Sequence, residues 1–198
     1  MEASTLLFLQ TDLRPDLIFD IGASCGISTH ILSAQYPRAK NIAYEPRPKA
    51  FARLQRRLQK LPGSHVAHLA AVGTRSGVIA LKDQGVGTGL ADQEEGSFTS
   101  TLVTLNEAVI SDRTKKVLLK IDVEGGEKDL LPWVVSRLPE QSVILLETHQ
   151  ALDEVESYAR SSLSAGFRWT LLRYREMPEY GGPFADWILT GPMVQFRF

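Results

Sequence analysis

The sequence has 198 residues, of which 43% are hydrophobic and 23% are charged, so it has enough apolar material for one buried core. These proportions exclude a disordered or fibrous chain. The 22 basic and 23 acidic residues leave a formal net charge of −1, which excludes a strong overall attraction to nucleic acid or anionic lipid. We expect a single domain over residues 1–198, with its core at about 17–190 and a short N-terminal segment at 1–16.

Targeting and redox signals favour a cytoplasmic protein. The single cysteine, Cys25, has no second cysteine in the chain with which to form a disulfide. No apolar run approaches the roughly 20 residues that span a bilayer. Residues 1–10 lack the basic start and long apolar stretch of a signal peptide. We therefore expect a reducing, cytoplasmic setting and no membrane association.

Short apolar runs alternate with amphipathic stretches over the first two thirds of the chain, which is typical of a parallel sheet flanked by helices. Pro132 is expected to interrupt or restart the helix that follows the strand at 117–122. In chain order, we expect strands at about 17–21, 41–44, 65–72, 78–81, 117–122 and 143–146, and helices at about 27–36, at 48–61 and after residue 126.

The last third of the chain indicates one more helix and a closing pair of strands. Asp153 opens a capping-box-like helix start, and Gly166 stands where a C-cap is expected. Residues 167–174 and 186–198 follow as antiparallel strands, with Gly191-Pro192 as a turn. The pattern predicts an α/β fold with a mostly parallel sheet, helices on both faces and an antiparallel C-terminal hairpin.

Residues 83–98 are polar and rich in glycine. We expect a mobile loop there, because such loops in compact domains often cover a ligand; plain disorder is the alternative. The core leaves little other chain to build a lid. This loop, or a second subunit of a homo-oligomer, is therefore expected to complete the binding pocket.

The first strand ends in a turn with glycines at Gly22 and Gly26, and a helix follows. Ligands of open α/β sheets bind beyond the carboxyl ends of the strands, and the N–H groups at a helix start attract anions. The turn lacks the three glycines of a G-x-G-x-x-G dinucleotide motif, so it suits a single carboxylate better than a pyrophosphate. A purely structural strand-to-helix turn is the alternative.

The second strand ends at Glu45, about 20 residues beyond the glycine turn. An acidic residue at this place can accept hydrogen bonds from the ribose hydroxyls of a nucleoside cofactor. The alternative is a surface glutamate that precedes a helix. The position at a strand end favours the ribose interpretation.

The run Lys120–Glu127 places four ionisable side chains within eight positions at the end of the strand at 117–122. Charged groups are costly to bury, so these are either solvated or gathered around a ligand. Together with Phe19-Asp20-Ile21-Gly22-Ala23 and Tyr44-Glu45-Pro46, the segment Lys120-Ile121-Asp122-Val123-Glu124-Gly125 resembles the FkbM family of S-adenosylmethionine (SAM)-dependent methyltransferases. The resemblance covers roughly residues 17–190.

This resemblance implies a Rossmann-like class I methyltransferase fold with seven strands, SAM as cofactor and S-adenosylhomocysteine as product. It also implies methyl transfer to a hydroxyl of a small metabolite, sugar or natural-product intermediate. Gly22–Gly26 would hold the methionine part of SAM, Glu45 the ribose and Ala71 the adenine, with Asp122 beside the sulfonium. The expected cofactor-binding residues are Asp20, Gly22, Ala23, Ser24, Gly26, Thr29, Glu45, Pro46, Ala71 and Asp122.

Two features depart from the family pattern. Ser24 and Cys25 stand where the family often has Asn and an apolar residue, which affects the geometry of the turn. Relatives also commonly carry more than the 16 residues that precede the first strand here.

A hydroxyl acceptor needs a base, because its pKa is near that of water, about 15. We expect Asp122, Glu147 and His149 on the catalytic side, and Lys120 and Glu124 on the substrate side. Structural pairing of Lys120 with a carboxylate is the alternative for that residue. An oxygen-rich divalent-metal site is also an alternative, although we do not favour it.

Other functions remain open at this point. The basic run between Arg47 and Lys60 would suit nucleic acid, but it is better explained as the solvated face of an amphipathic helix. The same fold could methylate nitrogen or a macromolecule, or bind SAM as a scaffold without turnover. A nicotinamide-dependent dehydrogenase is a more distant alternative.

Overall fold

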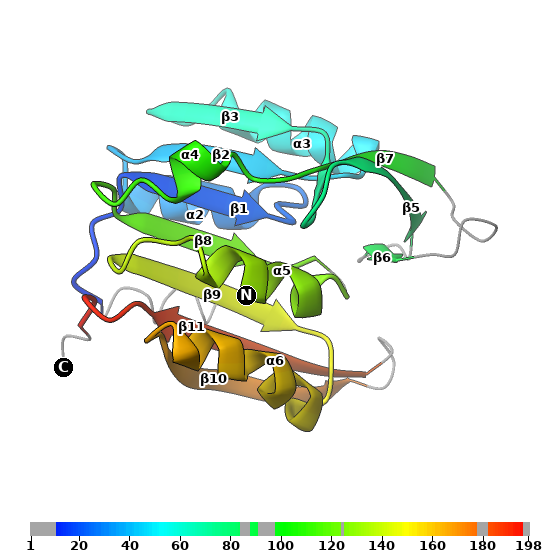
Figure 1. Cartoon of the computed structure of the whole chain (residues 1–198). Coiled ribbons are helices and arrows are strands. Elements are labelled where there is room, and N and C mark those ends of the chain that lie inside the picture. The colour runs from blue at the N-terminus through cyan, green and yellow to red at the C-terminus, as the bar shows by residue number, and fades with distance from the viewer. Residues whose placement is uncertain (1–10, 84–87, 91–97, 124, 178–181, 196–198) are drawn as a thin grey trace.

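The computed structural model describes residues 11–83, 88–90, 98–123, 125–177 and 182–195. A seven-stranded sheet forms its centre, in the order β10-β11-β9-β8-β1-β2-β3 (Figure 1). Its strands are β1 (Leu17–Ile21), β2 (Lys40–Tyr44), β3 (Ser64–His68), β8 (Val117–Ile121), β9 (Ser142–Thr148), β10 (Arg168–Met177) and β11 (Gly182–Thr190).

The central strands are covered on both faces, as the apolar runs predict. Every residue of β1 and β8 is buried. β1 pairs in parallel with β2 on one side and β8 on the other, so the strand order reverses direction at β1. Ligands of open α/β sheets bind at such a reversal, beyond the carboxyl ends of the strands.

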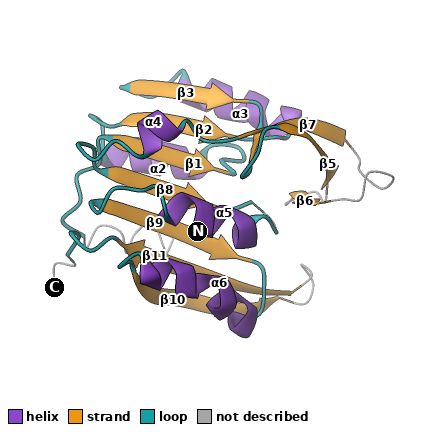
Figure 2. Cartoon of the chain, in the orientation of Figure 1, coloured by secondary structure: helices purple, strands orange, loops and turns teal. Residues whose placement is uncertain are grey.

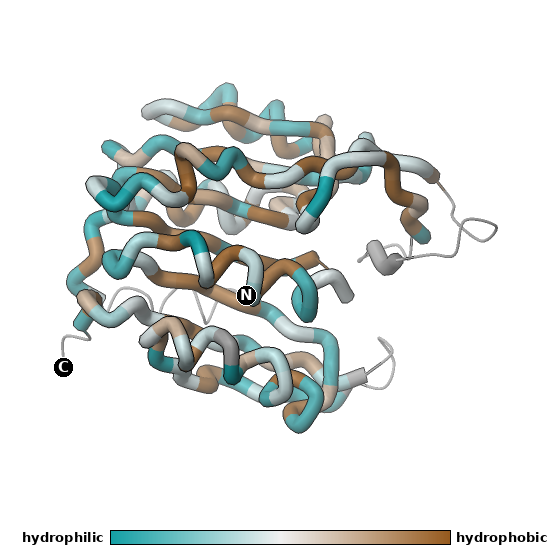
Figure 3. The backbone as a smooth tube through the Cα atoms, in the orientation of Figure 1, coloured by the Kyte–Doolittle hydropathy of each residue, from teal (hydrophilic) through white to brown (hydrophobic). Residues whose placement is uncertain are grey.

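Helices cover both faces of this sheet (Figure 2). α2 (Ile27–Gln35) and α3 (Pro48–Leu58) lie on one face, and α4 (Glu107–Ile110), α5 (Glu127–Val135) and α6 (Leu152–Ser164) lie on the other. Alternate strand residues supply the two cores: Ile18 packs in the cluster of Leu32, whereas Phe19 packs in the cluster of Leu131. Figure 3 shows hydrophobic residues gathered along these strands.

The expected α/β fold with a mostly parallel sheet and an antiparallel C-terminal hairpin is confirmed. β10 and β11 pair antiparallel, and β11 pairs antiparallel with β9. α3 is amphipathic as expected, with Leu54 buried while Arg53, Arg56 and Lys60 are exposed. In the described part of the chain, no helix is long and apolar enough to span a membrane.

A second sheet was not expected. It has four strands in the order β4-β7-β5-β6, which are β4 (Ala71–Val72), β5 (Gly77–Asp83), β6 (Thr88–Leu90) and β7 (Phe98–Val103). The single strand expected at 65–72 is therefore wrong, because the chain leaves the central sheet after His68 and enters the second sheet at Ala71. Most of the expected 83–98 loop lies outside the described residues, and β6 falls within it.

Two other expectations at element ends are wrong. Pro132 does not interrupt α5, which continues to Val135. The proline forgoes one hydrogen bond, to the carbonyl of Lys128, and Lys128 is exposed to water that can replace it. The last strand ends at Thr190 and does not resume within the described residues up to 195, although the expected turn at Gly191-Pro192 is confirmed. α6 begins at Leu152, one residue before the expected cap, and Gly166 has the positive φ of 82° expected after a helix end.

Candidate functional site

A cavity of about 740 Å³ opens at the carboxyl ends of β1, β2 and β8, where the sheet topology places a ligand. Small-molecule sites usually measure about 300–1,000 Å³. Ile79, Leu81 and Leu102 of the second sheet form part of its wall. From the expected set, the lining includes Gly22, Ala23, Ser24, Glu45, Pro46, Ala71, Lys120, Asp122 and Glu147.

Not every expected site residue reaches this cavity. Asp20, Gly26, Thr29 and His149 are not among the residues that line it. Glu124, which was expected on the substrate side, lies outside the described residues. The two groups have different roles in the geometry, because the lining residues can touch a ligand and the others hold them in place.

Gly22 is required for steric reasons. Its φ is +75°, and a Cβ at this position would lie 1.7 Å from the carbonyl oxygen of Asp122. The turn after β1 thus packs directly on the end of β8. The N–H groups of Gly22 and Ala23 both donate to the carbonyl oxygen of Tyr44, which ties the turn to β2 as well.

Gly26 allows a close contact with the helix α3. Its φ is +83°, and a Cβ here would lie 2.7 Å from a methyl carbon of Leu54. The close approach that the structure shows is therefore between the start of α2 and the helix α3.

Asp20 stabilises the turn after β1 through hydrogen bonds and an ion pair. It is buried, and its Oδ2 accepts hydrogen bonds from Ser28 Oγ at 2.7 Å and from Thr29 Oγ1 at 2.5 Å. Its Oδ1 lies 3.2 Å from Lys120 Nζ. Asp20 and Thr29 therefore fix the start of α2 against β1 and β8.

Lys120 joins three groups of the site. Its ammonium donates to the carbonyl oxygen of Gly22 at 2.6 Å and pairs with Asp20 at 3.2 Å and with Asp122 at 3.3 Å. Burial alone would lower the pKa of Lys120, but the charges of Asp20 and Asp122 outweigh it, so the pKa is raised. A permanently charged lysine with these partners fits the structural alternative, although part of the residue lines the cavity.

Glu45 is buried and presents its carboxylate at the end of β2. Its Oε2 accepts a hydrogen bond from Ser24 N at 2.8 Å, and its Oε1 accepts from Arg47 N at 2.9 Å and Arg47 Nε at 3.2 Å. The side chain is therefore fixed in one orientation at the cavity wall. Each carboxylate oxygen has two lone pairs, so Oε1 is saturated but Oε2 can still accept one ligand hydroxyl.

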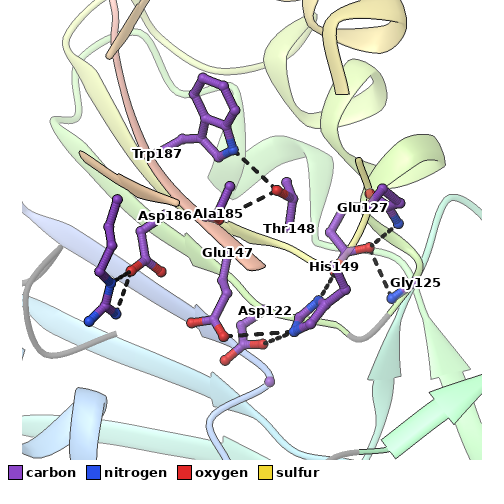
Figure 4. A network of polar contacts seen from close by, with 12 residues as sticks. Asp122, Gly125, Glu127, Glu147, Thr148, His149, Ala185, Asp186 and Trp187 are labelled. Atoms are coloured by element: carbon purple, nitrogen blue, oxygen red, sulfur yellow. Dashed lines mark hydrogen bonds and ion pairs between the residues drawn. The ribbon is translucent and has the colours of Figure 1, made fainter. Parts of the chain in front are cut away.

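Asp122, Glu147 and His149 converge from the ends of β8 and β9 (Figure 4). His149 Nε2 lies 3.7 Å from Glu147 Oε1 and 4.0 Å from Asp122 Oδ1. One ligand atom from each of the three residues lies within 4.8 Å of the others, so the group could hold a divalent cation. Sequence reasoning brought these residues together correctly.

Glu127 belongs to this site, and we had not expected a role for it. It is fully buried at the start of α5, and its Oε1 lies 3.0 Å from His149 Nδ1. Its Oε2 accepts hydrogen bonds from Gly125 N and Gln150 Nε2. Burial raises the pKa of Glu127, but the hydrogen bond and charge of His149 outweigh it and the pKa is lowered. The sequence signal was present, because Glu127 is the fourth ionisable residue of the β8 run.

Glu147 has the perturbed acidity that is typical of catalytic groups. Burial, followed by the charge of Asp122, raises the pKa of Glu147 from 4.5 to about 7. The side chain lines the cavity, so a ligand can reach it. Near neutral pH this carboxyl can therefore both take up and release a proton.

The solved structures that this chain resembles include methyltransferases. A crystal structure of the methyltransferase FkbM from Methylobacillus flagellatus KT matches with a TM-score of 0.64 and 15% sequence identity, over 94% of this chain and 47% of that chain. A precorrin-6y C5,15-methyltransferase from Geobacter metallireducens GS-15 matches with a TM-score of 0.54 and 16% identity, over 95% and 86% of the two chains. This chain has the class I methyltransferase fold. The fold that the FkbM resemblance implied is thereby confirmed.

Sequence comparison also finds a curated relative of this chain. The chain is 27% identical over 150 residues to the hexuronic acid methyltransferase AglP of Haloferax volcanii. The match covers 74% of this chain and 62% of the relative, so the chain spans less than two thirds of that protein. No family model matches the sequence.

Proposed function

We propose that this protein is a SAM-dependent methyltransferase that methylates a hydroxyl group of a small, sugar-like acceptor. The observation that carries the proposal is that one cavity reaches from the glycine turn and Glu45 to Asp122 and Glu147. The methyltransferase fold and the hexuronic acid methyltransferase among its relatives support the same assignment.

The residues at one end of the cavity fit SAM. The turn from Gly22 to Cys25 would hold the methionine part, where the absence of a Cβ at Gly22 keeps the backbone close to β8. Glu45 Oε2 would accept a hydrogen bond from a ribose hydroxyl, and Pro46 and Ala71 would border the adenine. When bound, SAM supplies an electrophilic methyl group.

Glu147 is the general base in this proposal. It lines the cavity and can take the proton from the acceptor hydroxyl as the oxygen becomes nucleophilic. A base with a pKa of about 7 is ionised in useful proportion at neutral pH and still holds a proton well. Base catalysis of this kind typically contributes about 10²- to 10⁴-fold in rate.

His149 is a positioning residue, because it is not among the residues that line the cavity and it touches the base. Glu127 holds its Nδ1, so that Nε2 faces Glu147 and Asp122. This arrangement fixes the orientation of the ring, as a carboxylate does for the histidine of other catalytic groups. His149 therefore acts through Glu147 and not on the acceptor directly.

A divalent cation held by Asp122, Glu147 and His149 is the second candidate for activating the acceptor, since their ligand atoms converge within 4.8 Å. A cation would lower the pKa of a bound hydroxyl without a separate base. Chelator treatment distinguishes the two mechanisms. The base mechanism predicts unchanged turnover after dialysis against EDTA, and the metal mechanism predicts its loss and its recovery with added Mg²⁺ or Mn²⁺.

Two measurements test the function itself. SAM or S-adenosylhomocysteine at 100 times its Kd should raise the free energy of unfolding by about 2.7 kcal/mol, whereas NAD should have no effect. Incubation with methyl-labelled SAM and a panel of sugars should then transfer label to a hydroxyl. Binding without transfer to any acceptor would favour the scaffold alternative, and transfer to an amine or a macromolecule would replace the acceptor class.

A further inference from the structure

Two arginines of β10, Arg173 and Arg175, line the cavity together with Glu147. We propose that Arg175 binds an anionic group, a carboxylate or a phosphate, on the methyl acceptor. The substrate is then an acidic sugar or a similar hydroxylated acid, held by its anion while a hydroxyl faces Glu147. This inference rests on the proposed methyltransferase function and names its substrate class.

Strand register places Arg173 in the same row of side chains as Glu147, two strands away. β11 lies between β9 and β10, and Asp186 of β11 faces Glu147 on one side and Arg173 on the other. Facing residues of paired strands point to the same side of a sheet. Arg173, Asp186 and Glu147 therefore form one row on the cavity side.

Arg175 lies two residues further along β10 than Arg173, in the next row of side chains on the same face. It faces Phe184, whose ring meets the ring of His149 edge to face at 4.8 Å. Alternate residues of a strand share a face, so Arg175 points to the same side as Arg173. Two strand spacings of about 4.8 Å put its backbone roughly 10 Å from that of β9. A hexose with its substituents can bridge that gap.

The two arginines differ in their partners. Arg173 Nε and Nη2 both contact Asp186 Oδ2, at 2.7 and 2.5 Å, so its charge is neutralised within the protein. Arg175 Nε is buried without a hydrogen-bond partner among the described residues. A buried guanidinium N–H without such a partner is costly, and a ligand anion would supply one.

The other cations of the cavity do not compete for this anion. Lys120 pairs with Asp20 and Asp122, and Arg47 pairs with Glu45. Arg75 is exposed on the turn after β4, near Ala71 at the cofactor end. At the acceptor end, Arg175 is the cation that lacks an acidic partner among the residues described.

The charges of the cavity also determine the orientation in which the acceptor binds. Asp122 and Glu147 disfavour an anion at the reacting end, whereas the planar guanidinium of Arg175 matches a carboxylate or phosphate with two parallel hydrogen bonds. An acidic acceptor therefore binds with its anion at β10 and a neutral hydroxyl at Glu147.

Binding experiments on the whole chain, saturated with S-adenosylhomocysteine, test the proposal without turnover. Methyl glycosides of hexuronic acids are titrated beside the matched neutral hexosides and hexose 6-phosphates. The wild type should bind one acidic series more tightly than the neutral one, and which series wins identifies a carboxylate or a phosphate. Arg175→Gln should weaken acid binding by roughly 10- to 100-fold and leave neutral hexosides almost unchanged.

Arg75→Gln is the matched control, because it removes the same charge from the other end of the same cavity. It should leave the ratio of acid to neutral binding at the wild-type value. Arg175→Lys should restore part of the preference, which a merely structural role would not predict.

The contradicting results are distinct from failure of the proposed function. Equal binding of acidic and neutral sugars by the wild type would overturn the proposal, as would an unchanged preference in Arg175→Gln. A base-labile methyl ester as product would place the acceptor anion at Glu147 and overturn the orientation. If S-adenosylhomocysteine does not bind, the methyltransferase function fails, and titration of the acids alone still reports whether Arg175 binds an anion.

Discussion

The two ends of the cavity differ in how completely their polar groups are paired. At the glycine turn, Asp20, Glu45 and Lys120 each have at least two partners within the protein. At the ends of β9 and β10, Glu147 has a strongly raised pKa and Arg175 Nε has no partner among the described residues. The residues at the glycine turn can hold a ligand in a fixed place, whereas Glu147 can exchange a proton and Arg175 can bind a charge.

The largest effect is expected from removing the base. Glu147→Gln keeps the shape of the side chain but cannot accept a proton, so kcat should fall by about 10²- to 10⁴-fold. Affinity for S-adenosylhomocysteine should stay within a few-fold of the wild type. Asp129→Asn, which removes another carboxylate from the cavity lining, is the control and should keep near-normal turnover. Normal turnover in Glu147→Gln would eliminate it as the base.

A substitution at Gly22 is expected to disrupt the end of the cavity at the glycine turn. Gly22→Ala places a Cβ 1.7 Å from the Asp122 carbonyl oxygen at a φ of +75°, so we expect a loss of about 2–5 kcal/mol in the free energy of unfolding. Gly77→Ala is the matched control, since its Cβ would have nothing within 4 Å, and it should cost less than about 1 kcal/mol. Urea unfolding measures both, and equal stabilities would show that the turn does not pack as described.

The raised pKa of Glu147 makes stability depend on pH. A carboxyl whose pKa rises from 4.5 to about 7 on folding binds its proton more tightly in the folded state. Its contribution is therefore full below pH 4.5 and is lost as the pH rises through about 7, amounting to about 3 kcal/mol. Unfolding curves at pH 5 and pH 8 should show this loss in the wild type relative to Glu147→Gln. Parallel curves for the two proteins would contradict the burial of an ionisable Glu147.

A smaller effect is expected from replacing His149, which neighbours Glu147. Protonated His149 lowers the pKa of Glu147, so His149→Gln should move the midpoint of the pH–rate profile upward from about 7. Turnover at neutral pH should fall by up to about tenfold. Phe184→Leu alters the other neighbour of the ring without changing a charge, so its profile should keep the wild-type midpoint. If both variants shift the midpoint equally, packing and not charge is responsible.

Much of the cavity end at the glycine turn could be predicted from the sequence, because its residues stand at the carboxyl ends of strongly apolar strands. The alternation of apolar runs located β1, β2 and β8, and the topology of parallel sheets then brought Gly22, Glu45 and Asp122 to one edge. The sequence also located β9, and thereby Glu147 and His149.

The rest required long-range information. The strands of the second sheet are short, contain glycine and polar residues and lack a clear period, so their pairing was not predictable. Arg175 stands in a strand with several charged residues, and nothing local separates it from Arg173. Only the register with β11 gives Arg173 its partner, Asp186, and leaves Arg175 beside Phe184.

Calorimetric titration of S-adenosylhomocysteine into the wild type, Glu45→Gln and Glu147→Gln tests the division of the cavity most directly. The wild type and Glu147→Gln should bind with the same affinity within a few-fold. Glu45→Gln should bind roughly 10-fold or more weakly, because its hydrogen bond to the ribose is no longer charge-assisted. Equal affinity in all three proteins, or a loss confined to Glu147→Gln, would contradict the placement of the cofactor at the glycine turn and of the chemistry at Glu147.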